Sequence, residues 1–346
     1  MIREAIGSLV AGHSLSESEA AAAMDEIMTG TATPAQLGAF LVALRLKGET
    51  VDEVTGMARG MRRAGAHVPL PDHIRALDTC GTGGDGADTF NVSTAAGLLV
   101  AALGQPVAKH GNRAASSRCG SADVLEALGV KLELGPEAVA QCIERTGFGF
   151  MFAPTYHPAM RHVGPTRREI GVRTIFNILG PLTNPAGAQY QALGVADAAL
   201  VPLMAHTLLR LGCARALVFH GLDGVDEFSL SGPTLVAEVR GESGDVVEYR
   251  VTPESVGLPT RARDEMRGGD AAHNAALLRR TLSGEETGAP AEFVALNAGA
   301  ALYVSGRAAS IADGVREARD ALRVGRAIST LDALVATTQR LAAGAA

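Results

Sequence analysis

The chain has 346 residues, of which 47% are hydrophobic and 20% are charged, and its formal net charge at pH 7 is −6. This composition predicts one large or two smaller domains with a sizeable core, and it excludes a disordered chain. The negative charge argues against nucleic acid or an anionic membrane surface as the main partner.

The cysteines and the apolar runs indicate the cellular compartment of the protein. Its four cysteines are far apart and form no C-x-x-C motif, which argues against a zinc or dithiol site and fits a reducing compartment. The first residues lack the pattern of a signal peptide, and no apolar run approaches the roughly 18 residues of a membrane span. We therefore expect a soluble cytoplasmic protein with no membrane partner.

Residues 1–66 carry the pattern of consecutive helices. Three capping-box patterns, which satisfy the first backbone N–H groups of a helix, occur at intervals along this region. They are Ser14 with Glu17, Thr33 with Gln36, and Thr50 with Glu53. Between them, apolar residues recur at helical spacing. Small residues on these helices suit close helix–helix contact, either inside the chain or across a dimer.

After a proline-containing linker at residues 67–72, strands alternate with helices. The expected strands are residues 75–79, 106–109, 130–134, 148–152, 189–195 and 215–220. This alternation is typical of a largely parallel sheet covered by helices. Residues 235–251 are expected to form a hairpin around Gly241 and Gly244, and residues 290–343 further helices with Ser310 and Asp313 at a cap.

One predicted helix interrupts the alternation. Residues 165–179 have a helical pattern that ends at Gly180 and Pro181, and we expect this helix to pack onto the N-terminal helices. The predicted fold class is therefore α/β, with a small all-helical domain and a larger α/β domain around a largely parallel central sheet. The helical domain is predicted to take residues 1–70 together with 165–185, and the α/β domain residues 71–164 and 186–346.

Residues 78–94 form a glycine-rich loop between a predicted strand and a predicted helix. Glycines let backbone N–H groups approach a phosphate, and the start of a helix adds partial positive charge, so this loop predicts an anion site. Ser93 and Thr94 occupy the expected N-cap position, where their hydroxyls would cap the helix or face the ligand.

Three other motifs overlap this loop, and each fails. Gly81, Gly83 and Gly86 match the dinucleotide fingerprint, but the helix opens late and the acidic residue expected about 20 positions on is missing. A single copy of the calcium-binding nonapeptide cannot bury a core, which takes roughly three stacked copies. The Gly-Lys-Ser/Thr of a Walker loop is missing.

Residues 109–123 form a second strand-to-helix loop, rich in basic residues, serines and glycines. Lysine and arginine supply charge, while hydroxyls and backbone N–H groups supply geometry, so this loop predicts a second anion site.

Further residues suit the counter-charges of a polyphosphate substrate. Asp226 and Glu227 follow a predicted strand in a glycine-containing loop, an arrangement that suits Mg²⁺ held by carboxylates and substrate phosphate oxygens. Arg167 and Arg168 fall in the first turn of the helix predicted from Pro165, where cations oppose the helix dipole. This unfavourable position hints at an external carboxylate or phosphate.

Several motifs in a fixed order give the chain a resemblance to a known family. They are Gly81-Thr-Gly-Gly-Asp85, Asn91-Val-Ser-Thr94, Lys109-His-Gly-Asn112, Ser121-Ala-Asp123, His157-Pro-Ala-Met160, Arg167-Arg-Glu-Ile-Gly-Val-Arg-Thr174 and Asp226-Glu227. In this order they resemble the anthranilate phosphoribosyltransferases over nearly the whole chain. The resemblance implies transfer of phosphoribose from 5-phosphoribosyl pyrophosphate (PRPP) to the amine of anthranilate, with Mg²⁺, in tryptophan biosynthesis. It also implies a homodimer formed through the helical domain.

The resemblance assigns site residues by position. Those that would bind PRPP are Gly81, Gly84, Asp85, Thr89, Asn91, Val92, Ser93, Thr94, Lys109, His110, Gly111, Asn112, Arg113, Ala114, Ala115, Ser116, Ser117 and Ser121. Those that would contact anthranilate are Gly81, Asn112 and Arg167, and those that would contact Mg²⁺ are Ser93, Asp226 and Glu227. Cys119 stands where the family often has serine and is left out of the site.

These residues suit the implied chemistry. Pyrophosphate leaves through an oxocarbenium-like state, so catalysis rests on charge stabilisation and on positioning of the amine. An aryl amine is largely deprotonated near neutral pH and needs no strong general base. No residue is therefore assigned as the base, and His110 is either a proton-transfer group or a structural histidine.

Two other functions are compatible with related architectures. Pyrimidine nucleoside phosphorylases share part of the 109–123 pattern, but they use phosphate and a nucleoside and need no acidic metal pair. A non-catalytic nucleic-acid-binding relative is the other alternative, and the net charge of −6 argues against it.

Overall fold

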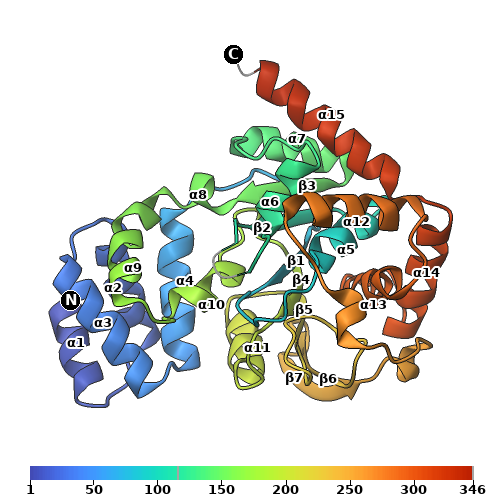
Figure 1. The fold of residues 1–346 in the computed structure, drawn as a ribbon. Coiled ribbons are helices and arrows are strands. Elements are labelled where there is room, and N and C mark those ends of the chain that lie inside the picture. The colour runs from blue at the N-terminus through green and yellow to red at the C-terminus, as the bar shows by residue number, and fades with distance from the viewer. Residues whose placement is uncertain (115–116, 345–346) are drawn as a thin grey trace.

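The structure is a computed structural model that describes residues 1–114 and 117–344. Ala115 and Ser116, which the resemblance assigns to PRPP, lie outside the described residues. Figure 1 shows a helical bundle at the N-terminal end of the molecule and a sheet covered by helices next to it. None of the described helices is both long and apolar enough to cross a bilayer.

The N-terminal region forms four helices, as its periodicity predicts. They are α1 (Ile2–Val10), α2 (Glu17–Met28), α3 (Pro34–Lys47) and α4 (Val51–Ala64). The capping boxes at Thr33 and Thr50 are confirmed. The box predicted at Ser14 is wrong, because α2 starts from Ser16 with Glu19. The N–H of Leu15 instead donates to the buried carboxylate of Glu53 at 3.0 Å, which keeps the chain out of the helix until residue 16.

Seven strands of the described residues form one sheet in the order β3-β2-β1-β4-β5-β6-β7. The first five are parallel, and β6 and β7 add the predicted hairpin in antiparallel pairing. The strands are β1 (Leu77–Gly81), β2 (Val107–Gly111), β3 (Phe148–Phe152), β4 (Tyr190–Gly194), β5 (Arg215–Gly221), β6 (Thr234–Arg240) and β7 (Asp245–Val251). The largely parallel sheet is thus confirmed.

The strand predicted at residues 130–134 is wrong. Val130, Leu132 and Leu134 are buried and alternate with exposed residues, which is why the segment has the pattern of a strand. Its backbone instead pairs with side chains: the N–H of Lys131 donates to Thr338, and the carbonyl of Leu134 accepts from the Tyr156 hydroxyl. Alternating burial therefore marks an extended segment that lies outside the sheet.

Helices cover both faces of the sheet. Alternate residues of β5 point to opposite sides, so that Leu217 and Phe219 join one apolar cluster and Ala216 and Val218 the other. The first cluster includes residues of α5 (Val92–Ala102), α6 (Ser121–Ala127), α7 (Pro136–Thr146), α12 (Ala271–Ser283), α13 (Ala289–Val304), α14 (Ile311–Arg323) and α15 (Ile328–Gly344). The second includes α11 (Leu200–Arg210) and the N-terminal helices, so one continuous core reaches into the bundle. The cap predicted at Ser310 is confirmed.

The single helix predicted at residues 165–179 is replaced by short ones. The chain forms α8 (Ala153–Tyr156), η1 (Pro158–His162), α9 (Gly164–Ile170), α10 (Phe176–Leu179) and η2 (Gly180–Leu182). Gly171, in the left-handed conformation with φ 67°, ends α9 and breaks the predicted helix in two. Figure 1 shows α9 beside the bundle, where it contacts α3.

Candidate functional site

Three loops meet at one edge of the sheet. They follow β1, β2 and β5, which are parallel, so their carboxyl ends lie on the same side. In open α/β sheets this edge is where ligands bind. The three loops contain most of the site residues expected from the sequence.

The first loop is held against the acidic loop by a carboxylate. Gly83, Gly84 and Gly86 have φ values of 64°, 79° and 69°, a conformation that favours glycine. The N–H of Gly83 donates to Oδ2 of Asp226 at 2.8 Å. A Cβ at Gly81 would lie 2.6 Å from the same oxygen, so glycine is needed there to make room for the carboxylate.

Helix α5 begins earlier than expected. Asn91 is its N-cap residue, so the prediction that Ser93 or Thr94 caps the helix is wrong, and both lie in its first turn. The Asn91 side chain makes no cap hydrogen bond because it joins distant elements. Its amide nitrogen donates to the Cys119 carbonyl at 3.1 Å, and its oxygen accepts from Asn274 at 3.0 Å. The side chain of Val92 is fully buried, which leaves only its backbone for a ligand.

Lys109 lies at the centre of a buried charge cluster. Its side chain is 2% exposed, and Nζ donates to the Thr79 carbonyl and, at 3.2 Å, to the Ser93 hydroxyl. Burial lowers its pKa, while the carboxylates of Asp78, Glu227 and Asp226 act in the opposite direction. The structure therefore brings Lys109 and Ser93 together with the acidic pair.

Neighbouring negative charges crowd the acidic pair, Asp226 and Glu227. Burial, followed by the nearby Asp85 carboxylate, raises the pKa of Asp226 to about 7. Burial and the charge of Asp226 raise the pKa of Glu227 well above its usual value. In addition, Asp85 accepts a hydrogen bond from the N–H of Asp226 at 3.3 Å. Carboxylates crowded in this way favour a proton or a cation between them.

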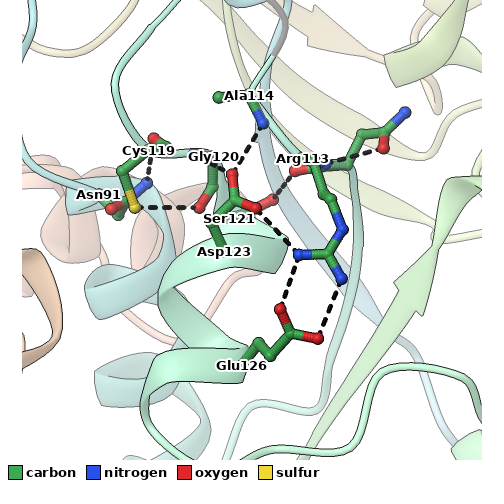
Figure 2. Close-up of polar contacts among 9 residues, drawn as sticks. Asn91, Arg113, Ala114, Cys119, Gly120, Ser121, Asp123 and Glu126 are labelled. Atoms are coloured by element: carbon green, nitrogen blue, oxygen red, sulfur yellow. Dashed lines mark hydrogen bonds and ion pairs between the residues drawn. The ribbon is translucent and has the colours of Figure 1, made fainter. Parts of the chain in front are cut away.

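The second loop is closed at its base by Asp123, as Figure 2 shows. One oxygen of this carboxylate accepts from the N–H groups of Ala114 and Gly120, both at 2.9 Å. Partial burial would raise the pKa of Asp123, but these two bonds and the Arg113 guanidinium hold it below its usual value. The two terminal nitrogens of Arg113 also donate to the two carboxylate oxygens of Glu126 at 2.7 and 2.9 Å, so its guanidinium faces α6.

Hydrogen bonds between side chains and the backbone hold other residues of this loop. The Ser121 hydroxyl donates to the Asn112 carbonyl at 3.3 Å, and the Asn112 side chain accepts from the N–H of the next residue at 2.7 Å. A Cβ at Gly111 would overlap Ser121, so the two segments approach closely. Ser117 is exposed on the loop, and Thr89 of the first loop pairs with Arg267 in an isolated bridge.

His110 points away from the charge cluster. Its Nδ1 lies 3.1 Å from the Gly180 carbonyl, and its ring centre lies 5.1 Å from that of His157. Burial, together with the neighbouring His157, lowers its pKa to about 3. The ring is therefore neutral at physiological pH and is a weak base.

Arg167 lies close to an aromatic ring, and its place in the helix differs from the predicted one. Because α9 is a short helix, Arg167 and Arg168 fall in its last turn, so the predicted conflict with the helix dipole is wrong. The Arg167 guanidinium lies 5.5 Å from the ring centre of Phe176 and is half-buried. Among the described residues, it forms no hydrogen bond with Asn112 or Gly81.

Some residues of the site could not be assigned from the sequence. Asp123 had a local signal, since it is the third helical residue after the N-cap Gly120 and its carboxylate accepts from the N–H of that residue. Asn274 had none, because its partner Asn91 lies far away in the chain. Arg173 belongs to the 167–174 motif, but its contact with the carbonyls of Gly83 and Gly84 could not be predicted, because they are also distant in the chain.

Comparisons with known proteins agree on one family. Residues 73–328 match the model of the glycosyl transferase family a/b domain, and residues 3–65 match that of its helical bundle domain. The anthranilate phosphoribosyltransferase of Rubrobacter xylanophilus is 55% identical over 342 residues, 99% of each chain. That of Chloroflexus aurantiacus is 55% identical over 338 residues, 98% of this chain and 99% of the relative.

Solved structures of similar proteins have the same fold. The crystal structure of anthranilate phosphoribosyltransferase from Thermus thermophilus superposes with a TM-score of 0.92 at 49% identity, covering 97% of this chain and 99% of that one. The Saccharomyces cerevisiae enzyme in complex with PRPP and Mg has a TM-score of 0.90 at 24% identity, covering 98% of each chain, a likeness of fold alone.

Proposed function

This chain belongs to the anthranilate phosphoribosyltransferase family, and we propose that the three loops at the carboxyl edge of its sheet carry the reaction of that family. The chain transfers 5-phosphoribose from PRPP to the amine of anthranilate, giving N-(5-phosphoribosyl)anthranilate and pyrophosphate in tryptophan biosynthesis. The observation that carries the assignment of the site is the contact of Lys109 with Ser93 beside the acidic pair Asp226 and Glu227.

PRPP would bind between the first and second loops. We assign it Gly81, Gly84, Asp85, Thr89, the Asn91 to Thr94 run, the residues from Lys109 to Ser117, and Ser121, as the resemblance implies. Val92 would take part through its backbone, because its side chain is in the core. Arg113 would take part through its backbone, since its guanidinium is bound to Asp123 and Glu126. Ala115 and Ser116 are assigned from the sequence alone.

The acidic pair fits Mg²⁺. Burial and neighbouring carboxylates raise the pKa of both Asp226 and Glu227, so a cation there would relieve the repulsion, and Ser93 adds a hydroxyl oxygen. The described residues form no group of three or more His, Cys, Asp or Glu side chains that could hold a metal ion by themselves, so substrate phosphate oxygens would have to complete the shell. When bound, Mg²⁺ supplies charge that stabilises the pyrophosphate leaving group.

The protein's own groups would stabilise the same charge and position the acceptor. Lys109, already desolvated, offers an ammonium group next to Ser93, and the loop offers backbone N–H groups. Arg167 would bind the anthranilate carboxylate with its planar fork, while Asn112 and Gly81 line the same place. His110 is neutral and turned toward Gly180, which supports a structural role for it.

Anthranilate fluorescence tests the reaction directly. Purified protein with PRPP and Mg²⁺ should remove the fluorescence, and the loss should require both additions. No loss, with PRPP still binding by calorimetry, would mean that the phosphate loops are correctly assigned and the acceptor is wrong.

The chain is proposed to act as a homodimer through its helical domain. Val42 and Leu46 of α3 are 38% and 82% exposed, and Val172 is 57% exposed and lines the same apolar groove. A second copy would cover this groove, as the family resemblance implies. In sedimentation equilibrium, Leu46→Glu should shift the protein toward monomer. A wild-type protein that is monomeric at micromolar concentration would contradict the proposal.

Domain division and cellular location are also proposed. We divide the chain into a helical domain, residues 1–70 with 165–185, and an α/β domain made of the rest; α9 contacting α3 supports this division. A cytoplasmic location is supported by four free, buried cysteines. Limited proteolysis at residues 67–72 and localisation of a tagged chain would test the two proposals.

A further inference from the structure

Arg173 binds the glycine-rich loop from the segment that carries Arg167. Its Nη1 donates to the Gly84 carbonyl at 3.0 Å and its Nη2 to the Gly83 carbonyl at 3.2 Å. One guanidinium therefore holds two successive peptide groups of a loop that lies 89 and 90 residues earlier in the chain. A Cβ at Gly84 would overlap Nη1, so glycine is required there to let the arginine approach.

The contact also fixes where the loop's N–H groups point. The described residues contain no cis peptide bond, and in a trans peptide the carbonyl and the N–H point in opposite directions. The carbonyls of Gly83 and Gly84 share their peptide groups with the N–H groups of Gly84 and Asp85. Those two N–H groups must therefore point away from Arg173, and no described residue accepts a hydrogen bond from either.

Unused N–H groups of successive loop residues are an anion site. Oriented backbone donors bind phosphate oxygens, and they stabilise developing charge best when their direction is fixed beforehand. We propose that Arg173 is a positioning residue that presents the N–H groups of Gly84 and Asp85 to the pyrophosphate of PRPP. This inference rests on the proposed function, which assigns that loop to PRPP.

The surroundings of Arg173 make the proposal testable without loss of the fold. Its side chain is exposed in the single chain, at the edge of the groove proposed to contact a second copy, and it also lines a cavity of about 250 Å³ together with Arg45, Asn177 and Asp197. Water can therefore hydrate a shorter side chain at this position, and truncation leaves no buried charge unpaired. The loop carbonyls would become free to rotate, and the N–H groups with them.

The test compares Arg173→Gln, Arg173→Lys and the control Arg168→Gln. Arg168 is a matched control because it is an exposed arginine on the same segment and makes no hydrogen bond to a described residue. Arg173→Gln should weaken the binding of PRPP, measured as KM, and of magnesium pyrophosphate, measured by calorimetry, by about 10- to 100-fold. The anthranilate KM and Tm should stay near wild type. Arg173→Lys lacks the forked guanidinium, so its affinities for PRPP and pyrophosphate should lie between those of the wild type and Arg173→Gln.

Unchanged PRPP and pyrophosphate affinities in Arg173→Gln would overturn the proposal, as would equal losses for both substrates. If Arg173→Gln fails to fold, Arg173→Lys decides alone: its affinity for pyrophosphate must fall while its Tm holds. Failure of the proposed function looks different, because the wild-type protein would then not consume anthranilate with PRPP and Mg²⁺, whereas the pyrophosphate measurement needs no turnover.

Discussion

The backbone N–H of Gly83 donates to Oδ2 of Asp226 at 2.8 Å, so the acidic loop after β5 is joined directly to the glycine-rich loop after β1. The two residues are 143 positions apart. Through this bond, a change in the charge of Asp226 acts on the geometry of the glycine-rich loop as well as on the proposed cation site.

The double variant Asp226→Asn with Glu227→Gln should lose turnover and keep its fold. Both side chains stay isosteric, and the amide oxygen introduced at position 226 can still accept from Gly83, but the charge that would hold Mg²⁺ is gone. Activity at saturating Mg²⁺ should fall by about 100-fold or more. Initial rates of anthranilate consumption against Mg²⁺ concentration measure this, with Tm as the folding control. An unchanged Mg²⁺ dependence would remove the pair from the site.

The same carboxylate predicts how stability changes with pH. In the folded, ligand-free protein the pKa of Asp226 is raised to about 7, while in the unfolded chain it is near its usual value. Between about pH 4 and 7 the folded state therefore binds more protons, and this group lowers stability as pH rises. Glu227 acts in the same direction.

Asp226→Asn removes the loss of stability that comes from deprotonating this carboxyl, so it should raise Tm in the presence of EDTA by more at pH 8 than at pH 5. Thermal unfolding of the two proteins at both pH values tests the sign. An equal effect at both values would show that the carboxylate is not perturbed in the folded state.

Arg167→Ala should affect the acceptor more than the donor. A bidentate pair between arginine and a carboxylate is strong and directional, so its loss should raise the anthranilate KM by about 10- to 100-fold. The PRPP KM should change by less than about threefold, because the guanidinium lies over Phe176, outside the two loops that we assign to PRPP. Steady-state kinetics with each substrate varied separate the two. The reverse pattern would assign Arg167 to PRPP.

The sequence predicted the parts of the site that are local in the chain. A strand, several glycines and a helix in a row predict a loop of known chemistry, because the glycines' conformations and the helix start are set by neighbouring residues. The acidic pair was predicted for the same reason, since it lies in the loop that follows β5.

The errors have physical causes as well. The segment 130–134 alternates like a strand, but a pattern of burial does not specify whether backbone partners are strands or side chains such as Thr338. Ser14 and Ser16 both offer a capping pattern, and a contact from Glu53 decides between them. The link between Arg173 and Gly84 spans 89 residues, so no window of sequence contains it.

The last prediction concerns Asp123, which holds the base of the second loop. One of its oxygens binds two N–H groups, and the other binds Arg113 at 3.1 Å. Asp123→Asn keeps the shape but loses the charge and one acceptor, so at least one of these bonds is lost. The PRPP KM should then rise about tenfold, because a charge-assisted bond is lost at the loop's base.

The matched control is Glu126→Gln, which removes the negative charge and one of the two exposed hydrogen bonds with Arg113 and leaves the bonds of Asp123 to Ala114 and Gly120 in place. Because an exposed ion pair contributes about 0–1 kcal/mol, the control should change the PRPP KM by less than about fivefold. Hydrogen exchange adds a readout that is independent of turnover: the amides of Ala114 and Gly120 should exchange faster in Asp123→Asn only. If the two variants lose PRPP affinity equally, the ion pair with Arg113 rather than the backbone bonds holds the loop.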